Sequence, residues 1–144
     1  MFVRDFVHVE RPFEMIAPRF LSDPGWLGTL LSSASGATAA RCKRGTVRRR
    51  ADTLVVPMHW ALDDEAALPP LDGDLAIVPI DPGRCRISFE ATYALDGESR
   101  EAPHITEHAV EAAVRAFLSH LVATLEAAGD GDEKRRPPGK EGRR

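Results

Sequence analysis

The chain has 144 residues, 43% of them hydrophobic, and a formal net charge of −3 at pH 7. This length suits a single domain with a sizeable core, which we expect to occupy residues 1–128. Residues 129–144 hold only glycine, proline and charged side chains, with a net charge of +2 that leaves −5 for the rest of the chain. We expect this tail to be disordered, and the acidic remainder excludes a typical nucleic-acid-binding domain.

The first residues mix charged with apolar side chains, and no apolar run approaches the length of a membrane span. We therefore expect a cytoplasmic protein with no integral membrane association. Cys42 and Cys85 are the only cysteines, too few for a disulfide-stapled scaffold or a Cys-based metal site, and both are expected to be free thiols. The sequence indicates no metal and no cofactor, and it leaves open whether the chain is a monomer or a homodimer.

The N-terminal part predicts strands on either side of two short helices. Residues 2–9 favour a strand. The helices are expected next, because Pro12 and Pro18 flank one apolar stretch and a second opens at residues 25–27. Residues 36–50 predict a further strand that turns back near Ala51 and Asp52. Residues 53–62 predict the next antiparallel strand, with an irregularity or an edge at Pro57 and one apolar face made by Leu54, Val56, Met58 and Trp60.

A hairpin is expected to follow, with arms at residues 74–80 and 85–95. Residues 81–84 read Asp-Pro-Gly-Arg, which places glycine where φ is positive, as in a type II turn. On the first arm the apolar positions change parity after Ile77, and Pro79 cannot donate a ladder bond, so we expect a bulge or an edge there. The inward face of the second arm is expected to carry Cys85, Ile87, Phe89, Ala91 and Tyr93.

The last predicted element is an amphipathic helix over residues 106–128, with a start signal at Pro103 and a stop at Gly129. Its apolar stripe has helical spacing: Val110, Ala113, Val114, Phe117, Leu118, Leu121 and Leu125. The order of elements predicts an α+β fold in which a curved antiparallel sheet wraps a long C-terminal helix. An apolar hollow between sheet and helix is where such a protein would hold a small molecule.

Several stretches carry a family resemblance that spans almost the whole expected folded part. They are residues 55–60 (VVPMHW), 68–75 (LPPLDGDL), the segment ending in Tyr93, and 110–118 (VEAAVRAFL). Together with the order of elements, they resemble short bacterial members of the START-like, polyketide-cyclase-like (SRPBCC) superfamily. The resemblance implies a helix-grip fold with two short helices near the N-terminus. It also implies a ligand that is a lipid, sterol, polyketide or other hydrophobic molecule, although a few members are cyclases or aromatases and the fold alone assigns no reaction.

Six large side chains are expected to face the hollow and are our candidates for ligand binding: Met58, Trp60, Phe89, Tyr93, Phe117 and Leu121. Trp60 and Tyr93 are the better candidates for orienting a ligand, because each has a polar group that needs a partner when buried. We assign no catalytic residue. His59 and Glu90 have outward parity, and His120 lies at the edge of the apolar stripe.

Two further motifs can each be interpreted as an ordinary exposed surface or as a functional site. Residues 104–108 (HITEH) match the H-x-x-E-H pattern of inverted zinc peptidases, but they fall at an exposed helix start, so the match is interpreted as accidental. Six cations occur within ten residues and form either an ordinary solvated surface or a site for phosphate, carboxylate or a membrane surface: Arg41, Lys43, Arg44, Arg48, Arg49 and Arg50.

Three functional hypotheses follow. The first is binding or carriage of a small hydrophobic molecule, lipid-like or polyketide-like, without catalysis. The second is a cyclase, aromatase or dehydratase acting on a polyketide-like substrate, which needs an acid or a base inside the hollow. The third is an interaction module that uses residues 41–50 and the charged tail to engage an acidic partner or a second copy of the chain.

Overall fold

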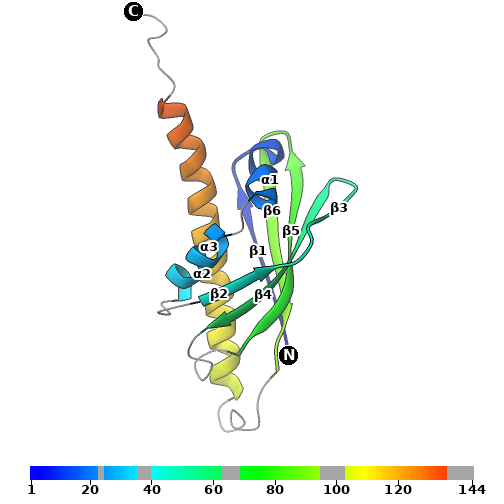
Figure 1. The fold of residues 1–144 in the computed structure, drawn as a ribbon, viewed down its shortest axis with the longest axis vertical. Helices are drawn as coiled ribbons and strands as arrows, with labels where there is room; N and C mark the ends of the chain where they lie inside the picture. Colours follow the sequence, from blue (N-terminus) through cyan, green and yellow to red (C-terminus); the bar gives the residue numbers. More distant parts are fainter. Residues whose placement is uncertain (23–24, 36–39, 63–68, 95–102, 136–144) are drawn as a thin grey trace, which may run out of the picture.

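The computed structural model describes residues 1–22, 25–35, 40–62, 69–94 and 103–135. Within these ranges six strands form one antiparallel sheet and three helices accompany it (Figure 1). In chain order the elements are β1 (Phe2–Val9), α1 (Phe13–Leu21), α2 (Gly25–Ser35), β2 (Ala40–Arg44), β3 (Arg48–Arg50), β4 (Thr53–Leu62), β5 (Leu71–Asp81), β6 (Arg84–Thr92) and α3 (Pro103–Arg135). The predicted α+β architecture is confirmed.

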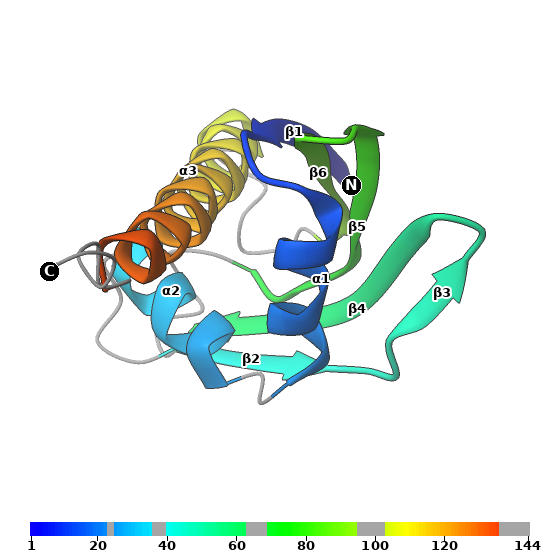
Figure 2. The same cartoon turned by 90° about the horizontal axis from the view of Figure 1, so that it is seen from above.

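The strand order in the sheet is β1-β6-β5-β4-β2, and β3 also pairs with β4. Inward positions of neighbouring strands lie opposite one another, for example Trp60 opposite Leu71 and Leu75 opposite Phe89. The sheet curves, and the three helices lie on its concave side (Figure 2). One face of the sheet is therefore the floor of the core, and the other is open.

The core lies between the concave face and α3. Six residues of the predicted stripe on α3 are at most 3% exposed: Val110, Val114, Phe117, Leu118, Leu121 and Leu125. Ala113, also predicted on the stripe, is only partly buried. The buried residues among those described are all hydrophobic, with no charged side chain. No helix in the described ranges has the length and apolar character needed to cross a membrane.

The predicted strand over residues 36–50 is split in two where it passes Pro57. Pro57 has no N–H to donate, and its carbonyl accepts a hydrogen bond from the N–H of Gly45 at 2.9 Å, between β2 and β3. The irregularity predicted at Pro57 is thus confirmed. The chain turns back at Ala51, which has a φ of 52°, and residues 36–39 lie outside the described residues.

The β5–β6 hairpin forms with a different turn from the predicted one. The register shifts between Pro79 and Asp81, so the expected bulge is confirmed. The type II turn is wrong, because Gly83 does not adopt the positive φ which that turn requires. Instead the N–H of Gly83 donates to the Asp81 carboxylate at 3.0 Å, so the aspartate side chain shapes the turn.

The start of α3 agrees with the prediction, and its end does not. The helix begins at Pro103, but it continues to Arg135, so the expected stop at Gly129 is wrong. The helix passes through Gly129 and Gly131, each of which costs about 1 kcal/mol relative to alanine, and it continues for about two turns beyond Ala128. Of the predicted tail, residues 136–144 lie outside the described residues.

Candidate functional site

The six predicted ligand-binding residues come together in the interior. They belong to β4, to β6 and the residue after it, and to α3, and each is at most 7% exposed: Met58, Trp60, Phe89, Tyr93, Phe117 and Leu121. Strand alternation places the first four on the concave face, and the helical stripe brings the last two down onto it. Their convergence follows from the sequence pattern, while their role in binding stays a prediction.

Three aromatic rings form the centre of this site. Trp60 stacks on Phe89 with ring centroids 4.9 Å apart and planes 8° apart. Phe117 descends from α3 and meets the edge of Trp60 at 4.8 Å, with an interplanar angle of 60°. Offset-stacked and edge-to-face pairs are the favoured geometries of aromatic rings. This aromatic trio forms an apolar cluster between the sheet and α3.

The indole of Trp60 has an unsatisfied polar group. Its Nε1 is buried, and no described residue accepts a hydrogen bond from it. The other tryptophan differs, because Nε1 of Trp26 donates to the carbonyl of Arg19 at 3.0 Å. An unpaired buried donor costs about 1–3 kcal/mol. Trp60 therefore presents an unused donor inside an otherwise apolar core.

Tyr93 supplies a second polar group at one end of the site. Its backbone pairs with that of Met1, since the Tyr93 N–H donates to the Met1 carbonyl at 3.0 Å and the Met1 ammonium donates to the Tyr93 carbonyl at 2.8 Å. Burial raises the pKa of the Tyr93 phenol, and the carboxylates of Glu107 and Glu111 on α3 raise it further. The phenol stays protonated at neutral pH and can donate a hydrogen bond.

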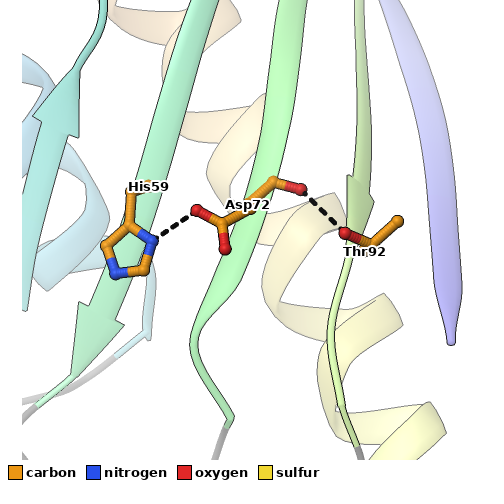
Figure 3. A network of polar contacts seen from close by, with 3 residues as sticks. All are labelled: His59, Asp72 and Thr92. Atoms are coloured by element: carbon orange, nitrogen blue, oxygen red, sulfur yellow. Dashed lines mark hydrogen bonds and ion pairs between the residues drawn. The ribbon is translucent and has the colours of Figure 1, made fainter.

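The candidate acids and bases lie away from the aromatic trio. His59 is on the open face of the sheet, where its Nδ1 lies 2.5 Å from Oδ1 of Asp72 (Figure 3). The hydroxyl of Thr92 donates to the Asp72 backbone carbonyl at 3.5 Å. The side chains of His59 and Asp72 are 42% and 71% exposed. The outward position predicted for His59 is confirmed, and this network lies in solvent.

The remaining candidates are equally exposed. Glu90 forms an ion pair with Arg4 at 3.1 Å on the open face of the sheet. His120 is exposed on α3, and Nδ1 of the exposed His108 lies 4.0 Å from Oε1 of Glu111 on the same helix. The side chain of His104 lies outside the described residues. Among the described residues, no three His, Cys, Asp or Glu side chains gather closely enough to hold a metal ion.

The two cysteines are free, as predicted. Burial raises the pKa of the Cys42 thiol to about 11. The pKa of Cys85 is also about 11, chiefly through burial, with smaller contributions from Glu14 and Asp81. The Cys85 thiol donates to the carbonyl of Arg11 at 3.4 Å. Both thiols are protonated at neutral pH, and neither is an activated nucleophile.

The basic run at residues 41–50 divides by strand parity. Arg44 points toward the helices and donates to the carbonyls of Phe20 and Ser22, the latter at 3.1 Å. Arg49 lies over the ring of Phe13, 5.6 Å from its centroid. These two arginines hold α1 against the sheet. Sequence reasoning missed this role, because α1 is distant in the chain.

Two hollows lined by described residues open elsewhere on the surface. One, of about 520 Å³, lies on the open face of the sheet beside Phe6 and Arg86, with Glu90 and Ser88 at its floor. The other, of about 260 Å³, lies between β1 and α3 beside Asp5. Asp5 faces α3, where its carboxylate lies 3.8 Å from Nε of Arg115. Neither hollow includes a predicted site residue.

Comparison with known proteins gives structural neighbours only. No family model matches the chain, and no curated protein sequence does. A conserved protein from Geobacillus kaustophilus aligns over 89% of this chain and 97% of its own, with a TM-score of 0.60 and 8% identity. An aromatase/cyclase from a Streptomyces species aligns over 88% and 93%, with a TM-score of 0.52 and 15% identity.

A norcoclaurine synthase from Thalictrum flavum is a third neighbour, with a TM-score of 0.51 and 17% identity over 86% of this chain and 94% of that one. These likenesses define the architecture as the START-like helix-grip fold. The helix-grip fold implied by the resemblance to the SRPBCC superfamily is confirmed. Identities this low carry no substrate or reaction from the neighbours to this chain.

Proposed function

We propose that the protein binds a small hydrophobic molecule, lipid-like or polyketide-like, in the apolar interior between the sheet and α3. The observation that carries the proposal is the buried, unpaired Nε1 of Trp60. A carbonyl or hydroxyl oxygen of a ligand would accept that hydrogen bond and remove its desolvation cost. The helix-grip fold is shared with a protein described as an aromatase/cyclase, which is consistent with a small-molecule role for this chain.

The aromatic trio defines the kind of ligand that fits. Its rings touch one another, so a ligand packs against them, with the ring of Phe117 turning aside to admit it. Apolar surface buried in this way contributes about 25 cal/mol per Å². One or two oxygen atoms on the ligand are enough to accept hydrogen bonds from the Trp60 indole and the Tyr93 phenol. The ligand class is therefore an apolar body with few hydrogen-bond acceptors.

We favour ligand binding without catalysis over a cyclase or dehydratase activity. The buried residues among those described include no carboxylate and no imidazole, and the two thiols are protonated. Among the described residues, the Tyr93 phenol is the inward oxygen acid, and burial raises its pKa. General acid–base catalysis works best when the pKa of the group lies near the working pH.

The experiment observes the Trp60 donor directly. The protein has two indole N–H groups, and a Trp26→Phe variant assigns their resonances in a nitrogen-15 NMR spectrum. Decanoic acid and 1-tetralone serve as lipid-like and polyketide-like probes. We expect a saturable shift of the Trp60 indole proton, with Trp26 as internal control because it already has a partner. No shift at Trp60 with either probe contradicts the proposal.

A further inference from the structure

The four cations of residues 41–50 that do not hold α1 share the open face of the sheet. Lys43 lies opposite the outward His59, Arg48 opposite Val55 and Arg50 opposite Thr53. Arg41 is two residues before Lys43 on β2 and therefore has the same parity. All four are exposed. We call this set the outer cation strip: Arg41, Lys43, Arg48 and Arg50.

No described residue neutralises the outer cation strip. None of its members forms an ion pair with a carboxylate in the part of the chain that the structure describes. The outward residues of β4 beneath it include no acid: Thr53, Val55, Pro57, His59 and Ala61. The carboxylates nearest the strip are Asp72 and Asp74 on β5, Glu90 on β6 and Asp52 in the β3–β4 turn. Four positive charges without an ion-pair partner among the described residues thus follow one edge of a body whose net charge is negative.

From this charge arrangement we infer that the outer cation strip docks the protein on an anionic lipid surface. The strip is open and divided between two strands, with Arg41 and Lys43 on β2 and Arg48 and Arg50 on β3. Neither of the two surface hollows includes a member of it. Figure 2 shows β2, β3 and β4 along one side of the molecule, with the helices only on the concave face. A diffuse, open array of cations fits a surface of many headgroups better than one small anion held in a pocket.

An acidic protein partner is disfavoured by what lies between the cations. Protein interfaces depend on buried aromatic or large aliphatic anchors at their centre. The outward residues of β4 are small, polar or β-branched, and none is a large aromatic anchor. A lipid surface needs no such anchor, because electrostatic attraction to a Lys or Arg strengthens binding by roughly fivefold per residue.

The inference rests on the proposed function in one respect. A hydrophobic cargo has low solubility in water, so it is collected from and delivered to membranes, and a carrier gains from residing at their surface. The docking surface itself is independent of the interior, because Arg48 and Arg50 point away from the aromatic trio. The two claims can therefore fail separately.

The test is co-sedimentation of the full chain with vesicles of phosphatidylcholine alone and with vesicles containing about one third phosphatidylglycerol. We expect binding only to the anionic vesicles, and release as added salt screens the charges. The double variant R48Q/R50Q should bind about 25-fold more weakly. The matched control R19Q/R115Q removes the same charge from α1 and α3, on the concave side of the sheet, and it should stay within about twofold of the parent.

Four results would overturn the inference. The first is equal binding to neutral and anionic vesicles. The second is an equal loss in both double variants, which would indicate net charge alone. The third is binding to soluble polyglutamate without binding to anionic vesicles, which would indicate an acidic protein partner. Absence of vesicle binding while the Trp60 indole still responds to probes overturns docking and leaves the proposed function standing. Vesicle binding without any response of the Trp60 indole overturns the proposed function and leaves docking standing.

Discussion

Phe117 on α3 meets the indole of Trp60 on β4 at a centroid distance of 4.8 Å, and this contact joins the helix to the centre of the sheet. Both side chains are at most 1% exposed. Truncation of a buried phenylalanine removes its transfer free energy and leaves a cavity. We expect Phe117→Ala to lower the free energy of unfolding by about 3–5 kcal/mol, measured by urea denaturation.

The control for that prediction is Phe6→Ala. Phe6 is 53% exposed on the open face of the sheet, where His8 and Arg86 lie against its ring. Its removal should change stability by less than about 1 kcal/mol. Equal effects of the two variants would show that α3 does not pack on the aromatic trio as described.

Gly73 on β5 lies directly against Ala91 of β6. A Cβ added there would lie 2.2 Å from the carbonyl oxygen of Glu90 and 2.6 Å from the Cβ of Ala91. Neither can yield without moving β6, so Gly73→Ala should cost at least about 2 kcal/mol or prevent folding. Gly83→Ala is the matched control. A Cβ there meets nothing within 4 Å, and Gly83 does not use a positive φ, so thermal unfolding should be nearly unchanged.

Arg44 anchors the C-terminal end of α1 through its bonds to the carbonyls of Phe20 and Ser22. Arg44→Ala leaves these carbonyls to water and should destabilise the fold by about 1–2 kcal/mol in chemical denaturation. Lys43→Ala, one residue earlier and facing solvent, should stay within about 0.5 kcal/mol. A larger loss for Lys43 than for Arg44 would contradict the inward and outward assignment of the basic run.

The raised thiol pKa values predict loss of stability at high pH. In the unfolded chain the thiols titrate near the ordinary value of 9.0, and in the folded chain near about 11. Above the lower value the unfolded state binds fewer protons than the folded state, so the free energy of unfolding falls as pH rises between the two. A C42A/C85A variant should show a shallower fall across this interval, while parallel curves would contradict the prediction.

The sequence predicts the framework well because the fold depends on hydrophobic period. Alternation on β4 and β6 identifies Trp60 and Phe89 as inward, and the helical stripe identifies Phe117. Features that depend on contacts between distant segments were not predictable. One such feature is that Arg44 bonds to α1 while the outer cation strip faces solvent, because this cannot be seen without knowing where α1 lies. The turn at Gly83 is another, because the Asp81 carboxylate replaces the backbone geometry that Pro-Gly favours.

The central claim is that the interior around Trp60 holds a hydrophobic ligand, and native mass spectrometry of freshly purified protein tests it most directly. The account predicts a bound species of one small apolar molecule per chain. In a Trp60→Phe variant, which keeps a ring but removes the N–H, affinity for that molecule should fall about tenfold. A spectrum that shows only the bare chain, even after incubation with decanoic acid and 1-tetralone, would contradict the account.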